Sequence, residues 1–235
     1  AWKQQECLLA VGEKYSVRAN AGNALKVLQQ FMHEHRGQWL FGHLGFGLQQ
    51  ETENIKSRHQ TNHMGFDDLY FFIPQMVLQC TTDSVQIFAD TQELAQQAYD
   101  EICATKFKKS NTSTRSINHV PKMTAAQYVD VVNTLKQHIK RGDCYEINFC
   151  QEFVADDVSA DAVELYHRLS KLSPNPFSCY YKVGAAHLAC ASPERYIMKQ
   201  GRQIISQPIK GTAQRDLQNV VNDDNAKNAL HKSDK

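Results

Sequence analysis

The amino-acid sequence predicts an α+β protein. Helical periodicity and strand-like alternation occupy separate stretches of the chain, and residues 177–209 read as four consecutive strands with turns at Gly184 and Gly201. Strands joined by tight turns pair in the antiparallel sense, whereas a doubly wound sheet needs a helix between successive strands. The segregation of helices and strands therefore favours the α+β class over a doubly wound one.

The first 120 residues are predicted to form an N-terminal α+β region. Apolar residues recur at helical spacing in the first helix, and Thr91 opens a second helix as its N-cap, with Glu93 in the first turn. The elements expected here are a helix over 21–36, a strand over 39–48, a strand over 84–89 and a helix over 91–107.

A polar segment separates this region from the rest of the chain. Residues 108–122, "KKSNTSTRSINHVPK", lack periodicity and contain Pro121. We expect a linker or surface loop here, with a domain boundary near residue 120 and a second domain over 121–235.

The second domain is predicted from stronger local signals. Thr124 and Gln127 form a capping box ahead of an apolar helical face, and Gly142 lies where a C-terminal cap is expected. The stretch 144–155 alternates as a strand, and the helix over 159–172 is expected to face inward with Ala162, Leu165, Tyr166, Leu169 and Leu172. Strands follow over 177–183, 186–192, 194–199 and 202–209, and a polar helical stretch over 222–235.

Charge and hydropathy exclude two classes of partner. The 235 residues are 42% hydrophobic, and 26 basic against 25 acidic side chains give a formal charge of +1. No basic block is present that would follow a phosphate backbone, and the apolar runs, such as "YFFIPQMVL", are too short to span a bilayer. We expect a cytoplasmic protein that binds neither nucleic acid nor membrane.

The seven cysteines form an odd set without a CxxC pair and lie mostly among apolar neighbours. This pattern is typical of buried thiols. We expect them to be reduced, with neither disulfides nor zinc.

The last hairpin brings an acid and an amine together. With a turn near Gly201, Glu194 faces residues 207–209, so Glu194 and Lys210 emerge at the same end of one strand pair. One interpretation is a salt bridge at a sheet rim, worth at most about 1 kcal/mol. The alternative is catalytic: the apolar run that includes Pro208 and Ile209 would desolvate the Lys210 ammonium and lower its pKa, as a nucleophile or base requires.

Several segments together are similar to the chorismate-utilising enzymes. They are "YVDVVNTLKQHIKRGDCYEINFCQEF", "SPNPFSCYY", "ASPERYI" and "QPIKGTAQR", in this order, with a weaker similarity over "GQWLFGHLGFGLQQETENI". The resemblance implies a fold like that of anthranilate synthase component I, with antiparallel sheets and helices on their outer faces. It also implies that residues 121–235 are the first part of a chorismate-binding catalytic domain, truncated at Lys235, and both chain ends are expected to be cuts.

Lys210 indicates the branch of the family that the chain resembles. Anthranilate, isochorismate and salicylate synthases usually carry alanine at this position, whereas "PIKGT" is typical of the aminodeoxychorismate branch, which makes the precursor of p-aminobenzoate for folate. In that branch Lys210 matches the nucleophile that attacks C2 of chorismate, and Glu194 matches the general acid that protonates the leaving C4 hydroxyl.

Other residues take roles from the same resemblance. Gly211 and Thr212 match residues that line the substrate site. Pro176, Phe177 and Ser178 match a segment that contributes to a tryptophan pocket in some relatives, so tryptophan is a further candidate ligand.

The resemblance further implies Mg²⁺ and a glutamine amidotransferase subunit that supplies ammonia. The glutamates that bind Mg²⁺ are expected beyond residue 235, with no metal ligand within this chain, so the chain alone is expected to be inactive. Two alternatives remain open: anthranilate synthase or another chorismate enzyme, in which Lys210 is incidental, and a non-catalytic module that binds tryptophan.

Overall fold

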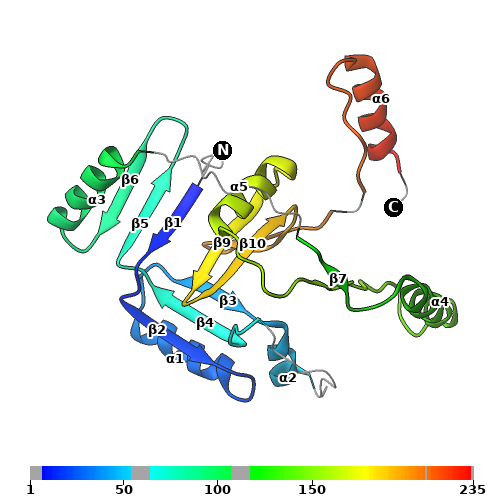
Figure 1. The fold of residues 1–235 in the computed structure, drawn as a ribbon, viewed down its shortest axis with the longest axis horizontal. Coiled ribbons are helices and arrows are strands. Elements are labelled where there is room, and N and C mark those ends of the chain that lie inside the picture. The colour runs from blue at the N-terminus through cyan, green and yellow to red at the C-terminus, as the bar shows by residue number, and fades with distance from the viewer. Residues whose placement is uncertain (1–6, 54–63, 107–116, 210, 234–235) are drawn as a thin grey trace. The chain divides into compact units, whose positions relative to one another are not determined.

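A computed structural model of the chain describes residues 7–53, 64–106, 117–209 and 211–233 (Figure 1). Contacts divide the chain into two units, Ala1–Lys109 with Lys182–Ala186 and Ser110–Tyr181 with His187–Lys235. The boundary predicted near residue 120 and the assignment of 121–235 to a catalytic domain stay predictions. The sheets of both units are built from antiparallel strands flanked by helices, which confirms the α+β class.

The first unit contains a three-stranded sheet in the order β1-β5-β6. Strand β1 alternates exposed and half-buried side chains, the central strand β5 carries the buried Val77 and Leu78, and Pro74 lies in the turn before β5, where a missing N–H costs no ladder bond. Helix α3 packs against β6 (Figure 1). The elements are β1 Cys7–Val11, β5 Met76–Cys80, β6 Val85–Ala89 and α3 Gln92–Ala104.

A second three-stranded sheet in this unit has the order β2-β4-β3, with α1 packed along β2 (Figure 1). Ala24 of α1, Leu48 and Leu69 of β4 form the centre of the core, at 0%, 6% and 0% exposure. The elements are β2 Tyr15–Ala19, α1 Ala24–Glu34, β3 Phe41–Leu44, the 3₁₀ turn Phe46–Leu48, α2 Gln49–Thr52 and β4 Leu69–Ile73.

A glutamate from α2 caps the start of α1. Glu51 Oε1 accepts hydrogen bonds from the N–H groups of Gly22 at 2.7 Å and Ala24 at 2.6 Å, and Oε2 accepts from Leu25 at 3.0 Å. These bonds, led by the one from Leu25, hold the pKa of Glu51 below its ordinary value. The carboxylate satisfies N–H groups that have no partner within the helix and complements the positive end of its dipole.

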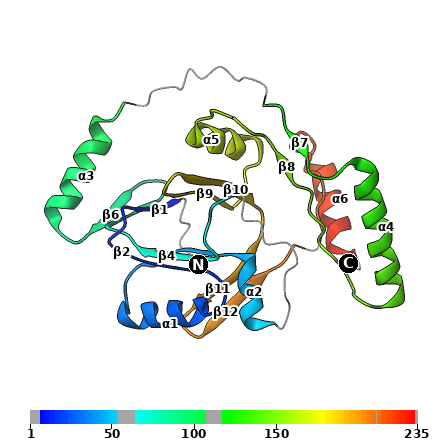
Figure 2. The same cartoon turned by 60° about the horizontal axis from the view of Figure 1, so that its bottom comes forward.

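The second unit consists of helices and two-stranded sheets. The capping box predicted for α4 is present, and Gly142 adopts φ +83° at its C-terminus. Helix α5 lies over β9 and β10 (Figure 2), and the rings of Tyr166 and Tyr180 are 5.9 Å apart between this helix and β9. The elements are β7 Val120–Pro121, α4 Ala125–Arg141, β8 Phe153–Val154, α5 Ala162–Leu172, β9 Phe177–Val183, β10 Ala186–Ser192, β11 Arg195–Gln200, β12 Gln203–Gln207 and α6 Val220–His231.

Two predicted strands are shorter in the structure, and part of a predicted buried helix face is exposed. The strand predicted over 39–48 ends at Leu44, because the chain turns into a 3₁₀ helix at Phe46, and the strand predicted over 144–155 is reduced to β8. Leu165 and Leu172 of α5 are 44% and 86% exposed rather than facing inward. Amphipathic spacing predicts a face for burial, but it does not supply the surface that covers it.

The cysteines are also not buried. Cys7, Cys103, Cys150 and Cys179 are exposed, and Cys80, Cys144 and Cys190 are intermediate, so the prediction of buried thiols is wrong. Apolar neighbours in sequence are a poor guide here, because alternate residues of a strand lie on opposite faces of its sheet.

Among the described residues, no helix is long and apolar enough to cross a membrane.

Candidate active site

The candidate general acid lies between two strands of the second unit. Glu194 follows Ser192 and Pro193 at the end of β10 and directly precedes β11. The Ser192 hydroxyl fixes this corner, since it donates to the Glu194 carbonyl at 3.2 Å and accepts from the Glu194 N–H at 3.3 Å. Such a local turn orients the carboxylate without a helix or strand of its own.

The Glu194 carboxylate reaches across the hairpin. Strands β11 and β12 pair with Arg195 opposite Gln207 and Gln200 opposite Gln203, and the turn has φ +58° at Gly201. Glu194 Oε1 accepts a hydrogen bond from the Ile209 N–H at 3.0 Å. The predicted register is thereby confirmed, because Glu194 faces the segment 207–209 and its carboxylate binds the backbone of Ile209. Lys210 itself lies outside the described residues.

The described residues that directly precede Lys210 are exposed or half-buried. Ile209 is 45% exposed, Pro208 is also exposed, and Ile205 is only half-buried. Desolvation of an ammonium requires apolar atoms around it, and the lowered pKa expected for Lys210 stays a prediction because this residue lies outside the described part of the chain.

Gly211 and Thr212 lead from the hairpin to α6. Together with Lys227, Asn228, Leu230, His231 and Ser233 they line a hollow of about 790 Å³. A Cβ atom at Gly211 would lie 3.0 Å from Leu230 Cδ1, so the glycine allows the helix to approach the backbone closely. The two predicted substrate residues thus lie beside a lysine and a histidine that the sequence did not single out.

A polar network joins this segment to the start of α6. Arg215 Nε donates to Asp223 Oδ1 at 2.7 Å, and the Asp216 N–H donates to the same oxygen at 3.0 Å. The pKa of Asp223 is lowered, first by the Arg215 hydrogen bond, and that of Asp216 is lowered, first by a hydrogen bond from Asn222. Neither residue was singled out from the sequence, because the two partners lie eight positions apart and belong to different segments.

The segment expected to border a tryptophan pocket contacts the same hairpin. Phe177 begins β9, and the Arg195 guanidinium lies 4.7 Å from the centre of its ring. Arg195 Nε also donates to Gln207 Oε1 at 2.9 Å, so one arginine joins β9, β11 and β12. Ser178 donates to the Asn175 carbonyl at 2.9 Å. Phe177 therefore contacts the hairpin, and the role of Pro176, Phe177 and Ser178 in tryptophan binding stays a prediction.

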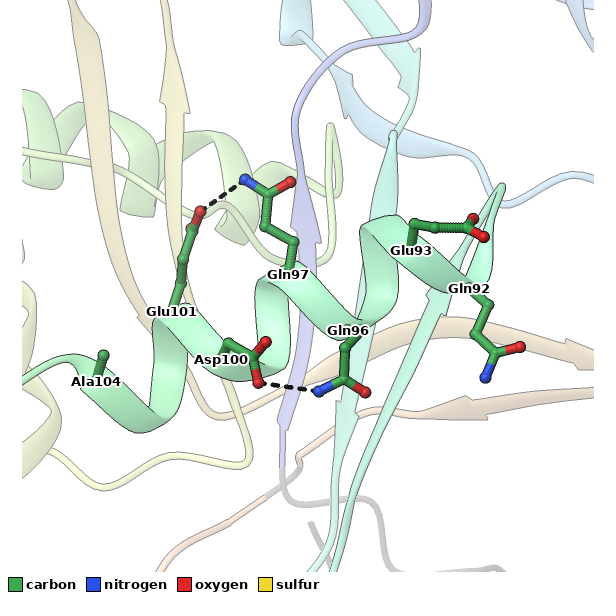
Figure 3. Close-up of a pocket in the computed structure, with 7 residues that line it drawn as sticks. All are labelled: Gln92, Glu93, Gln96, Gln97, Asp100, Glu101 and Ala104. Carbon is green, nitrogen blue, oxygen red and sulfur yellow. Dashed lines mark hydrogen bonds between the residues drawn. The ribbon is translucent and has the colours of Figure 1, made fainter.

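Another hollow, of about 760 Å³, lies along α3 in the first unit (Figure 3). All seven lining residues come from this helix, and polar contacts one turn apart already occupy several of them: Gln96 donates to Asp100 at 2.9 Å and Gln97 to Glu101 at 3.0 Å. It is a solvated helix face, and it includes none of the predicted site residues.

No cluster of three or more His, Cys, Asp or Glu side chains that could hold a metal ion occurs within the described part of the chain. The Mg²⁺ expected from the resemblance therefore finds no fitting ligand set among these residues, and no chemical step is derived through it.

Comparison with known proteins first defines the fold. Anthranilate synthase component I from Streptococcus pneumoniae superposes with a TM-score of 0.71 at 17% identity, over 87% of this chain and 54% of that one. The antiparallel sheets and flanking helices are thus those of an anthranilate synthase component I-like fold.

The sequence then identifies the family. The family of chorismate binding enzymes matches residues 2–235, and the chain belongs to it. Aminodeoxychorismate synthase component 1 of Escherichia coli K12 is 32% identical over 93 residues, covering 40% of this chain and 20% of that protein.

Two relatives match over a longer stretch. An anthranilate synthase component I-like protein of Synechocystis is 26% identical over 204 residues, covering 82% of this chain and 40% of the relative. Aminodeoxychorismate synthase component 1 of Bacillus subtilis is 25% identical over 172 residues, covering 71% and 36%. The matched regions thus span between a fifth and two fifths of the length of these curated relatives.

Proposed function

We propose that the chain forms part of an aminodeoxychorismate synthase component I, which converts chorismate and ammonia to 4-amino-4-deoxychorismate in the synthesis of p-aminobenzoate for folate. Membership of the chorismate binding enzyme family supports the substrate, and the relatives in E. coli and B. subtilis support the reaction. The single observation that carries the residue assignment is the Glu194–Ile209 hydrogen bond, which holds a carboxylate next to position 210.

The proposed reaction has two displacement steps. The Lys210 amine attacks C2 of chorismate and loses a proton, the two conjugated ring double bonds shift, and the C4 hydroxyl leaves as water with the proton that Glu194 donates. Ammonia then attacks C4, the double bond shifts back, and the C2–nitrogen bond to Lys210 breaks to release the amine. One ammonia enters and one water leaves overall.

Glu194 has the geometry for the first of these steps. Hydroxide is a poor leaving group, so a positioned proton donor accelerates its departure, typically by about 10²–10⁴-fold. Oε1 accepts from the Ile209 N–H, which leaves Oε2 as the oxygen that would donate the proton. Gly211 and Thr212 line a hollow against α6, in which part of the substrate would lie.

Further components belong to the proposal. A glutamine amidotransferase subunit would supply the ammonia, as the family resemblance implies, and Mg²⁺, for which the described residues offer no ligand set, would neutralise the substrate carboxylates. Tryptophan binding beside residues 176–178 is a further part of it.

A second candidate function is anthranilate synthesis from the same substrate. The Synechocystis relative and the S. pneumoniae structure, both named for anthranilate synthase component I, favour it. The two candidates share chorismate and ammonia and differ in their product, so the product decides between them.

The test is the product formed by the full-length protein from chorismate, ammonium and Mg²⁺, identified by liquid chromatography and mass spectrometry. We expect 4-amino-4-deoxychorismate from the wild type, and a large loss of this product, or its replacement by anthranilate, from Lys210→Ala. Lys199→Ala, which changes an exposed lysine on β11, should leave the product unchanged. Anthranilate as the sole wild-type product would refute the proposal.

A further inference from the structure

Two cysteines far apart in sequence face each other on the first sheet. Strands β1 and β5 pair in the antiparallel sense, with Cys7 directly opposite Cys80 and Leu8 opposite Gln79. Directly opposed residues of an antiparallel pair point to the same side of the sheet, with Cα atoms about 4.5 or 5.5 Å apart. A disulfide needs a Cα separation of about 4.4–6.8 Å, so this pair lies within reach of one.

The same arrangement recurs in the second unit. Strands β9 and β10 form one sheet and are joined by a turn at Gly184 and Ala185, and counting back along both strands places Cys179 opposite Cys190. The two thiols are hydrogen-bonded to each other. In both pairs one cysteine is exposed, Cys7 or Cys179, and the other is half-buried.

We propose that each facing pair is a dithiol modification site, which closes to an intrachain disulfide by exchange with a small disulfide of the glutathione class. Neither pair contributes to the proposed reaction, so the inference is independent of it.

The exposed cysteine reacts first. Its thiolate attacks one sulfur of the small disulfide, the S–S bond breaks, and one small thiolate leaves and takes up the proton. The thiolate of the half-buried partner then attacks the protein-bound sulfur of the mixed disulfide and releases the second small thiol. Two protein thiols are oxidised and one small disulfide is reduced to two thiols, so atoms and electrons balance.

The surroundings of the pair set the speed of this exchange. Although Cys7 and Cys179 are exposed overall, partial desolvation raises the pKa of each thiol, and the neighbouring Cys80 or Cys190 raises it further. Because the thiolate is the reacting species, exchange at neutral pH is slow and is faster at higher pH.

The experiment treats the full-length protein with a mixture of oxidised and reduced glutathione, followed by digestion without reductant and mass spectrometry of the peptides. We expect one cross-linked peptide that joins Cys7 to Cys80 and another that joins Cys179 to Cys190. In Cys80→Ser the exchange stops halfway, so Cys7 should carry a stable glutathione adduct. Cys150→Ser, which removes an exposed cysteine outside both pairs, should leave both cross-links intact.

The wild-type peptides alone keep the proposal testable even if Cys80→Ser fails to fold. If Cys7 and Cys80 carry separate glutathione adducts, or stay reduced while the exposed Cys150 is modified, the assignment of that pair is overturned. The same outcome at Cys179 and Cys190 overturns the second pair.

Discussion

The two units of the chain differ in how their elements are held. Every fully buried side chain of the described residues belongs to the first unit, between Ala24 and Ala98, whereas no described residue after position 116 is buried. In the second unit, large apolar side chains such as Leu172, Tyr196 and Leu217 are at least 85% exposed. The first unit is organised around a core, and the second consists of helices and hairpins whose apolar faces are formed but are not covered by other described residues of the same unit.

Secondary structure was predicted from the sequence more accurately in the second unit, which lacks a core, than in the first unit, which has one. The second unit has little burial, yet α4, α5 and the four strands of its two hairpins were predicted to within a few residues, because capping residues such as Thr124 and turn glycines such as Gly201 act locally. The first unit has the core, yet β1, β2, β4 and β5 were missed. Leu69 and Val77 lie in short apolar runs, and such runs do not distinguish a buried strand from a buried helix.

In the candidate site, too, a contact set by local sequence was predicted and contacts between separate segments were not. The approach of Glu194 to residue 209 followed from a two-strand register, which a turn glycine fixes. The exposure of Ile209, the Arg195 contact with Phe177 and the Arg215–Asp223 pair could not be predicted, because each depends on how separate segments meet.

A matched pair of leucine truncations should show the largest stability difference. In the 235-residue chain, Leu69→Ala removes a side chain that is 0% exposed and should lower the free energy of unfolding by about 2–5 kcal/mol. Leu172→Ala removes one that is 86% exposed and should change it by about 0.5 kcal/mol or less. Urea denaturation measures both, and equal losses would show that the apolar face of α5 is packed after all.

Alkaline pH should lower the stability of the first unit through a buried tyrosine. The Tyr70 hydroxyl donates to Glu13, and burial, followed by that bond, raises the pKa of Tyr70 to about 12. Because the folded-state pKa lies above the ordinary value of 10, the stabilisation is complete below about pH 10 and is lost as pH rises through about 12. The loss should be roughly 2–3 kcal/mol.

The measurement is urea denaturation at a series of pH values from 8 to about 12. Tyr70→Phe should remove this part of the alkaline slope, whereas Tyr196→Phe, at a tyrosine that is 85% exposed, should retain it. An unchanged slope in Tyr70→Phe would contradict the role given to the buried hydroxyl.

Two glycine-to-alanine substitutions should give the smallest difference in stability. A Cβ at Gly42 would lie 2.1 Å from the Tyr70 carbonyl oxygen and 2.7 Å from Phe71 Cα, and backbone cannot move aside cheaply. Gly42→Ala should therefore cost about 1–3 kcal/mol. Gly211→Ala meets only the flexible end of Leu230 and should cost about 0.5 kcal/mol or less. Thermal unfolding of the two variants compares them, and a larger loss at Gly211 would reverse the ranking.

The central claim is that Glu194 and Lys210 act together on chorismate, and covalent trapping tests it most directly. Full-length protein is mixed with chorismate and Mg²⁺ without ammonia, quenched and mapped by peptide mass spectrometry. We predict a chorismate-derived adduct on Lys210, less of it in Glu194→Gln, and an undiminished amount in the control Glu152→Gln. Continued formation of 4-amino-4-deoxychorismate by a Lys210→Ala protein, with no adduct on Lys210 in the wild type, would contradict the account.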